Sequence, residues 1–327
     1  MLKFLVILLL FTFSHAENNT TLDYIHNSIS QSVVHWSSYL DTTISQWMDT
    51  NKTCLADGGI QKNKTEKLDS FFQNDKYFEE TKDTFIRLRL NSHFFSKQSK
   101  KFDVKFHAQL PFDKCRKQFK LFIENDSSTT LHKTTNTNSG IGILYDSAEK
   151  YGITSRYSLG LHSSHPYVVA RYGIHYKVKN WNIESIQSFQ YSTNEQFEEE
   201  TNIYFDNFLE DDDLFRLRLH RKTGSSIKGF DYSSTFEYYF NATTDAGLRL
   251  SQSFYGNSKY TTPSKPNQHY AGIYNYQTSL SYRANIWRDW FFYEISPSIN
   301  YHRDYNYSSS YALRFFVDIY FGKYNSF

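Results

Sequence analysis

The stretch FIRLRLNSHF, from Phe85 to Phe94, decides the fold class, because polar and apolar side chains alternate along it. Arginine, arginine, asparagine and histidine stand at positions 87, 89, 91 and 93, and isoleucine, leucine, leucine and phenylalanine stand at 86, 88, 90 and 94. A period of two is typical of a β-strand, whose successive side chains point to opposite faces of a sheet. One face of this strand is charged and the other is apolar, so the fold depends on which face is buried.

The same alternation recurs from Thr84 to the C-terminus. Clear examples are 101–112 (KFDVKFHAQLPF), 168–178 (VVARYGIHYKV) and 313–321 (LRFFVDIYF). A soluble sandwich or barrel produces this pattern with its apolar face inside. A transmembrane β-barrel produces it with its apolar face outside and its polar face toward the lumen.

Three features favour the transmembrane barrel. The expected strands are about ten residues long or longer, against about five or six in a typical soluble sheet. The apolar face carries many tyrosines and a proline, which suit a lipid interface better than a dry core. Tryptophan and tyrosine also cluster at the expected strand ends, where an aromatic girdle would lie: Trp181, Trp287, Trp290, Tyr301 and Tyr324. The sequence therefore predicts an all-β fold, a transmembrane antiparallel β-barrel of about 14 strands, with 12 or 16 left open.

Composition agrees with this class. Aromatic residues make up 19% of the 327 residues, with 27 Tyr and 29 Phe, yet only 39% of residues are hydrophobic and the mean hydropathy is −0.63. That combination suits a protein with much aromatic surface and no dense aliphatic core. The net charge of +2 gives no electrostatic reason to expect nucleic acid as a partner, and the basic residues alternate along strands instead of forming a stripe.

The N-terminus predicts export. Lys3 precedes the apolar run Phe4–Phe13, and the small-x-small triplet SHA at 14–16 follows it, as at a signal-peptidase site. The run is too short for a spanning helix, which needs about 20 apolar residues. Residues 1–16 are therefore interpreted as a cleaved signal peptide, and the expected location is the Gram-negative outer membrane.

Residues 17–82 differ from the rest of the chain and are expected to form a periplasmic helix followed by a loose linker. Docking of this helix on the main domain and a role as a plug or partner-binding helix both remain open. Residues 83–327 are expected to form the barrel. The expected helix carries one apolar stripe at spacings of three and four: Leu22, Ile25, Ile29, Val33, Trp36, Leu40, Ile44 and Trp47.

The expected connections alternate between long and short, as in outer-membrane barrels. Long outward loops are expected at 126–140, 192–200 and 256–269, and short periplasmic turns at 113–117, 146–151, 179–181, 241–245 and 284–289. This places Cys115 on the same side as Cys54, so a disulfide between them is possible, and two free thiols are the alternative. Phe327 is a terminal aromatic of the kind that the barrel-assembly machinery reads.

The segment Tyr282–Tyr301 (YRANIWRDWFFYEISPSINY) resembles the signature of a family of uncharacterised proteobacterial outer-membrane barrels, YR…WRDW(F/L)F-E-x-x-P before the last hairpin. The resemblance extends to the FIRLRL strand and so covers residues 83–327. It implies an architecture, and it implies no substrate and no catalytic residue.

Charged residues on the polar face are the candidates for lining the lumen. Arginine–carboxylate pairs could brace and partly plug the interior, or an excess of cations could bias a pore toward anions. The candidates are Arg87, Arg89, Asp103, Lys105, Lys120, Glu124, Arg156, Arg171, Lys177, Arg216, Arg218, Glu237, Arg249, Arg283, Glu294, Arg314 and Asp318.

Signals for enzymatic chemistry are weak. The sequence has no G-x-S-x-G, H-E-x-x-H, P-loop or dinucleotide motif. The alternative function is a lipase- or protease-type hydrolase on a barrel scaffold, suggested by GLHSSH at 160–165 and by His302 with Asp304. We expect no catalytic residue, cofactor or metal. The expected partners are outer-membrane lipid and lipopolysaccharide, the assembly machinery, and small solutes or ions.

Overall fold

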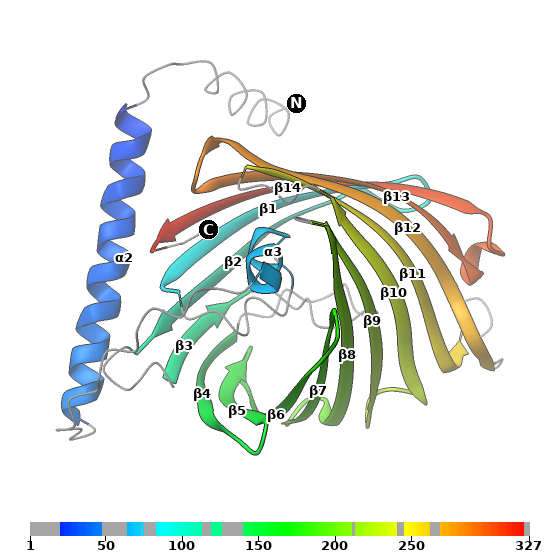
Figure 1. Ribbon diagram of the computed structural model, residues 1–327, viewed down its shortest axis with the longest axis horizontal. Helices are drawn as coiled ribbons and strands as arrows, with labels where there is room; N and C mark the ends of the chain where they lie inside the picture. Colours follow the sequence, from blue (N-terminus) through cyan, green and yellow to red (C-terminus); the bar gives the residue numbers. More distant parts are fainter. Residues whose placement is uncertain are drawn as a thin grey trace.

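The computed structural model describes residues 20–47, 64–72, 74, 83–112, 119–125, 140–210, 213–240, 245–261 and 269–323, and the structural statements below concern these residues. Fourteen strands of this part of the chain form one closed antiparallel barrel, in which neighbours in sequence are neighbours in space (Figure 1). The prediction of an all-β barrel with 14 strands is therefore confirmed. In chain order the strands are β1 (Phe85–Phe95), β2 (Lys101–Pro111), β3 (Phe119–Glu124), β4 (Gly140–Lys150), β5 (Ile153–His162), β6 (His165–Val178), β7 (Trp181–Ser192), β8 (Gln196–Glu210), β9 (Asp213–Gly224), β10 (Phe230–Phe240), β11 (Ala246–Thr261), β12 (His269–Arg288), β13 (Phe291–His302) and β14 (Ser309–Gly322).

The strand that contains FIRLRL closes the ring. β1 pairs with β2 on one edge and with β14 on the other, in a register that runs from Phe85 opposite Gly322 to Phe95 opposite Ala312. A backbone bond from the Lys323 amide to the Thr84 carbonyl, 2.8 Å long, extends this seam. We call the end of the barrel where β1 begins and β14 ends the proximal end, and the opposite end the distal end.

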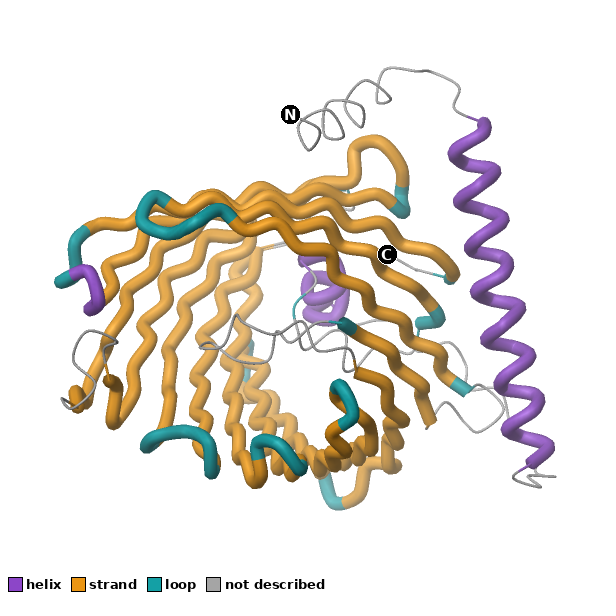
Figure 2. Tube along the Cα trace, turned by 180° about the vertical axis from the view of Figure 1, so that it is seen from behind, coloured by secondary structure: helices purple, strands orange, loops and turns teal. Residues whose placement is uncertain are grey.

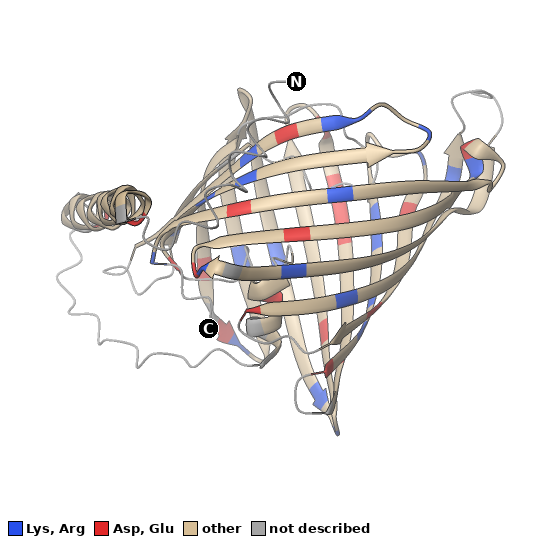
Figure 3. Cartoon of the chain, turned by 90° about the horizontal axis from the view of Figure 1, so that it is seen from above, with Lys and Arg blue, Asp and Glu red and all other residues tan. Residues whose placement is uncertain are grey.

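The two faces of the sheet are inverted relative to a soluble protein. Arg216, Arg283 and Asp318 are among the most deeply buried side chains, whereas Leu159 is 62% exposed and Leu280 is 42% exposed. Lys and Arg are interspersed with Asp and Glu along the strands (Figure 3). Because successive side chains of a strand alternate in direction, the buried charges face the interior and the exposed aliphatic side chains face outward.

Among the described residues, two helices precede the barrel. α2 (Thr20–Trp47) crosses the proximal end and packs against β14, β1 and β2 (Figures 1 and 3). α3 (Lys64–Phe72) lies within the ring of strands (Figures 1 and 2). The sequence analysis predicted a loose linker after the first helix, so it missed α3. None of the helices described is both long enough and apolar enough to span a membrane.

Four connections differ from the expected ones. One is the turn expected at 284–289, because β12 continues to Arg288 and pairs there with Phe291 of β13. β7 ends at Ser192 and β8 begins at Gln196, so the long loop expected at 192–200 is a turn of residues 193–195. The acidic run at 198–200 reads as a loop, but Glu198 is buried and belongs to the paired strand. Similarly, β4 continues to Lys150 and β11 to Thr261, where register shifts after Tyr255 bend the ladder.

Several predictions fall outside the described residues. These are the signal peptide at 1–16, the cysteines Cys54 and Cys115, the aromatic Tyr324, the terminal Phe327, the turn at 113–117, and nearly all of the connections at 126–140 and 241–245. At the distal end, a short 3-10 helix, η2 (Arg303–Tyr305), joins β13 to β14.

Gly322 tests the importance of the closing seam. Its φ is +104°, and a Cβ there would lie 2.6 Å from the Thr84 carbonyl oxygen. Gly152 is a matched control, because its φ is +74° but a Cβ would meet nothing within 4 Å. We expect Gly152→Ala to cost about 1–2 kcal/mol of unfolding free energy from its backbone conformation alone. Gly322→Ala should cost clearly more in guanidinium unfolding, and equal costs would show that the seam tolerates the clash.

Candidate functional site

Asp69 of α3 is fixed to the barrel wall by Arg216 of β9. The guanidinium binds the carboxylate with two bonds, Nη1–Oδ1 of 2.5 Å and Nη2–Oδ2 of 3.1 Å. The same guanidinium binds Asp206 of β8, with Nε–Oδ1 of 2.7 Å and Nη2–Oδ2 of 2.8 Å. All three side chains are buried. Charge-assisted bidentate contacts of this kind are about twice as strong as neutral hydrogen bonds, so they hold α3 in one position. We call Asp69, Arg216 and Asp206 the α3 anchor.

Two phenylalanines of α3 pack against different parts of the wall. The Phe71 ring lies 6.1 Å from that of Phe292 in β13, and the Phe72 ring lies 5.0 Å from that of Tyr239 in β10. Gly247 of β11 makes this approach possible, because a Cβ there would lie 2.9 Å from Phe72 Cζ. With these rings, side chains of β1, β9 and β14 complete the buried cluster. α3 therefore occupies the lumen beside a run of strands from β9 round to β1.

Asn74, just beyond α3, links the anchor to a second group of charges. Its amide nitrogen donates to Asp69 Oδ1 at 2.6 Å and to the Tyr239 hydroxyl at 3.2 Å. Its amide oxygen accepts from Arg249 Nη1 of β11 at 3.0 Å. Because one amide uses both its donor and its acceptor sides here, the end of α3 is tied to both β10 and β11.

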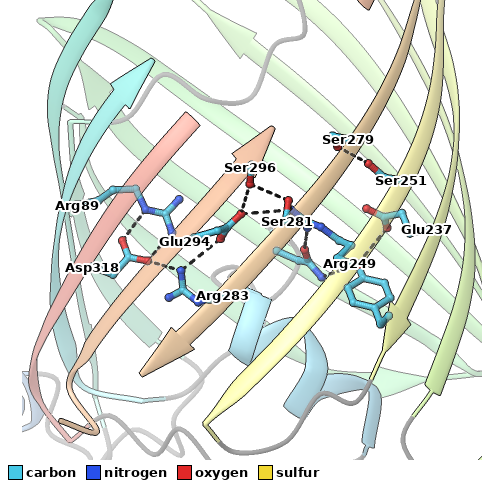
Figure 4. Close-up of polar contacts among 12 residues, drawn as sticks. Arg89, Glu237, Arg249, Ser251, Ser279, Ser281, Arg283, Glu294, Ser296 and Asp318 are labelled. Carbon is cyan, nitrogen blue, oxygen red and sulfur yellow. Dashed lines mark hydrogen bonds and ion pairs between the residues drawn. The ribbon is translucent and has the colours of Figure 1, made fainter. Parts of the chain in front are cut away.

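The second group is an inner ion-pair network that crosses five strands (Figure 4). Asp318 of β14 binds Arg89 of β1 at 2.5 and 2.7 Å, and it also binds Arg283 Nη1 of β12 at 2.7 Å. Arg283 reaches Glu294 of β13 at 3.4 Å, and Arg249 of β11 reaches the same carboxylate at 3.7 Å. The inner ion-pair network therefore consists of three arginines and two carboxylates, and it spans the closing seam.

Other charges pair on the remaining strands. Asp146 of β4 contacts Lys120 of β3 at 3.3 Å and Arg156 of β5 at 2.5 Å. Toward the distal end, Lys222 of β9 contacts Glu198 of β8 at 3.2 Å. The interior is thus lined by paired charges of both signs.

The remaining predicted lumen residues are spread over the strands. Arg87 of β1 is buried and stands opposite Tyr320 and His107. Asp103 of β2 accepts from Asn91 Nδ2 at 2.6 Å, and Glu237 of β10 accepts from the Tyr239 hydroxyl at 3.1 Å. Lys105 lies in β2, Arg171 and the exposed Lys177 lie in β6, and Glu124 lies in β3, where only its backbone is described. Arg218 of β9 lies above the Tyr204 ring, and Arg314 of β14 stands opposite His93.

The sequence interpretation missed several members of this site. Asp69 and Asn74 stood in a supposed linker, and Asp146 and Glu198 stood in or beside supposed loops. For Glu198 a partial signal exists, because polar residues recur at every second position from Glu198 to Asp206, but the intervening Glu199 and Thr201 are polar as well and hide the strand. For Asp69 the only signal is a short apolar pair that follows it, FF at 71–72.

The residues that suggested a hydrolase make contacts that stabilise the fold. His302 Nδ1 accepts from the Asp304 amide at 3.1 Å and so caps η2. The Asp304 carboxylate accepts from the Tyr260 hydroxyl at 2.8 Å. His162 lies at the end of β5, where its ring packs 5.8 Å from that of Tyr167. Among the described residues, no group of three or more His, Cys, Asp and Glu side chains is arranged to hold a metal ion.

Chemically, this interior can hold water and polar solutes. Hydroxyl pairs lie beside the ion pairs: Ser296 donates to Ser281 at 2.8 Å next to Glu294, and Ser251 and Ser279 are 2.7 Å apart farther along the wall (Figure 4). A surface of hydroxyls and compensated charges is wettable, while the neighbouring carboxylates and guanidiniums satisfy one another.

No family model and no curated protein matches the chain. Among solved structures it is similar to an anion-selective porin from Comamonas acidovorans, with a TM-score of 0.46, 7% identity, and coverage of 72% of this chain and 98% of that one. It is also similar to OprD of Pseudomonas aeruginosa, with a TM-score of 0.43, 10% identity, and coverage of 73% and 94%. The KdgM porin in complex with oligogalacturonate is similar with a TM-score of 0.35 and 8% identity, and the match covers 71% of this chain and 98% of that one. These identities are too low to match a residue of those porins with a residue of this chain.

Substitution of Asp318 tests how much the inner ion-pair network contributes to the stability of the barrel. Asp318→Asn leaves Arg89 and Arg283 buried next to a neutral amide, and removing one partner of a buried pair costs about 3–5 kcal/mol. Asp231→Asn is the control, because Asp231 accepts a hydrogen bond from Asn257 Nδ2 at 2.6 Å in the same interior. We expect the midpoint of guanidinium unfolding in detergent micelles to fall much further for Asp318→Asn. Similar midpoints for both variants would contradict a central role for Asp318.

Proposed function

We propose that this protein is a channel of the Gram-negative outer membrane whose lumen is constricted at the proximal end by α3. The observation that carries the proposal is the position of α3, inside a closed ring of strands and fixed to the wall by the α3 anchor. The channel passes water, ions and small polar solutes when α3 moves away from the wall.

The outer face of the barrel supports a membrane location. Large apolar side chains are exposed around the ring, and a closed barrel leaves no strand edge unpaired in lipid. In water this surface would be a very large apolar patch, which soluble monomers rarely expose. Outer-membrane lipid and lipopolysaccharide are therefore the proposed neighbours. The proximal end faces the periplasm, because β1 begins and β14 ends there.

The connectivity of the strands supports a movable constriction. Every strand has two strands as neighbours, so the ring closes without any contribution from α3. The charges of the α3 anchor and of Arg249 lie in a polar interior that water can enter when the helix leaves. When α3 is displaced, water therefore solvates the charges that were paired with it, and the hydrogen bonds between the strands stay intact.

The balance of charges supports weak selectivity. Arg89, Arg216 and Arg283 each contact a carboxylate, as do Lys120 and Lys222. A paired cation contributes little net field to a passing anion. We therefore propose a barrel braced by salt bridges, with at most a slight preference for anions, in place of a strongly anion-biased wall.

Channel recordings test the constriction. In planar bilayers we expect low conductance for the native chain. The triple variant Asp69→Asn, Phe71→Ala, Phe72→Ala should show several-fold larger unitary steps, because it removes both the charged and the aromatic contacts of α3. Glu198→Gln is the control, because it breaks an ion pair of the distal interior and leaves α3 in place. Reversal potentials in a KCl gradient should stay close to zero.

The outcomes separate the possible functions. Equal conductance of all three proteins would show that α3 does not constrict the lumen. The absence of current from the native chain and from the triple variant, with folded barrels in both, would favour a purely structural barrel. A large reversal potential of anionic sign would favour the basic-wall alternative.

A pair of leucines tests the membrane assignment. Leu280 lies in the middle of β12, and Leu209 lies one residue from the end of β8; both are exposed on the outer face. In lipid vesicles we expect Leu280→Arg to cost about 2–4 kcal/mol and Leu209→Arg about 0–1 kcal/mol, because arginine is most unfavourable at the bilayer midplane. Urea unfolding of the vesicle-inserted proteins measures this difference. Equal costs at the two positions would speak against a bilayer around the barrel.

A further inference from the structure

α2 packs on the barrel with an unexpected side. His26, Val33, Ser37 and Asp41 are its buried positions. The His26 ring stacks on Trp290 with 4.2 Å between centroids and lies 5.3 Å from Phe321. Its Nε2 donates to the Tyr320 carbonyl at 2.7 Å. The docked side of α2 is therefore largely polar, although the sequence gives the helix an apolar stripe.

Arg288 fixes the N-terminal part of the same helix. Its guanidinium binds the Asp23 carboxylate with bonds of 2.8 and 3.0 Å. The hydrogen bond from Arg288 holds the pKa of Asp23 below its ordinary value, so this pair is ionised in neutral solution. Together with the His26 contacts, this pair sets the rotation of α2 about its own axis.

That rotation leaves part of the apolar stripe uncovered. Ile25, Ile29 and Trp36 are 48%, 41% and 62% exposed, and spacings of four and seven residues place them on one line along the helix. Tyr39 adjoins this line, with its ring 6.1 Å from that of Trp36. Farther round the helix, the exposed positions are mostly polar and include Ser28, Gln31 and Ser38, although Tyr24 among them is 74% exposed. We call Ile25, Ile29, Trp36 and Tyr39 the α2 apolar strip.

The position of α2 on the barrel indicates what covers this strip. The helix lies across the proximal end of the barrel, beside the ends of β14, β1 and β2 (Figures 1 and 3). A helix at the end of the barrel lies at the surface of any membrane that the barrel crosses. It rests on the proximal aromatic cluster, in which the Trp287, Trp290 and Phe291 rings lie 5.3 to 6.4 Å apart. Aromatic rings of this kind gather at the level of the lipid headgroups.

We propose that α2 is an interfacial helix whose apolar strip inserts into the phospholipid leaflet around the proximal end of the barrel. This inference rests on the proposed membrane location, and it assigns a lipid-binding surface outside the barrel wall. Helices of this type bury their apolar face about 5–10 Å into the boundary between headgroups and acyl chains.

The composition of α2 specifies the kind of lipid surface. Interfacial helices usually carry Lys and Arg on their polar face, which attract anionic lipids. α2 contains neither residue: its exposed polar positions are serine, threonine, asparagine, glutamine and His35, while Asp23 and Asp41 lie toward the barrel. The strip therefore binds by apolar insertion, and a zwitterionic leaflet such as one of phosphatidylethanolamine or phosphatidylcholine is sufficient.

Tryptophan quenching by brominated phosphatidylcholine tests this surface in the full chain. A reporter variant keeps Trp36 and carries Phe at Trp47, Trp181, Trp287 and Trp290. A matched control adds Trp36→Phe and Ser38→Trp, which moves the single indole to the polar side of the same helix. A third variant carries the single indole on the barrel wall through Trp36→Phe and Leu159→Trp. Heat-modifiable gel mobility verifies that each barrel is folded.

We expect the Trp36 reporter to lose much of its emission with bromine near the lipid carbonyls, and less with bromine deep in the acyl chain. The Ser38→Trp control should lose little, and added salt or anionic lipid should change neither result. An unquenched Trp36 beside a quenched Leu159→Trp reporter would overturn the lipid surface and leave the membrane barrel intact. An unquenched Trp36 in a chain that sediments as a dimer would assign the strip to a second copy. If neither reporter is quenched, the membrane location itself fails.

Discussion

The structure depends on the pairing of β1 with β14. This ladder turns a sheet with two free edges into a ring in which every strand has two partners. A closed ring separates an inside from an outside, and the alternation of side chains then sends alternate residues to each. Because FIRLRL lies in the closing ladder, its arginines enter the interior together with Asp318, which the last strand supplies. Closure and charge pairing are thus produced by the same two strands.

Much of this arrangement follows from a period of two in the sequence. That period predicts the strands, their number and the inward direction of Arg89, Arg216 and Asp318, because the rule is local and repeats along the chain. It fails where a run of charges imitates a loop, as at Glu198. Strand alternation alone does not reveal which carboxylate an arginine meets, since Arg283 finds Asp318 two strands away.

The helices show a different limit of sequence reasoning. The apolar stripe of α2 indicates a helix, yet the barrel contacts a side turned away from Ile25 and Trp36. The docking side is chosen by particular partners, the Tyr320 carbonyl and the Arg288 guanidinium, which no periodicity contains. α3 is nine residues long, and isolated helices of that length are marginal in water. It is stabilised by tertiary contacts of Asp69, Phe71 and Phe72, so its own sequence predicts it poorly.

The place of α3 in the chain also bears on assembly. α3 precedes β1, and β14 follows the other thirteen described strands in the chain. A helix that already lies against β9–β13 when β14 meets β1 is enclosed without ever passing through the mouth of the barrel. Gly247 leaves a recess for Phe72 on β11, which precedes β14 in the chain. The order in which strands join therefore decides whether the barrel is completed around an occupied lumen or an empty one.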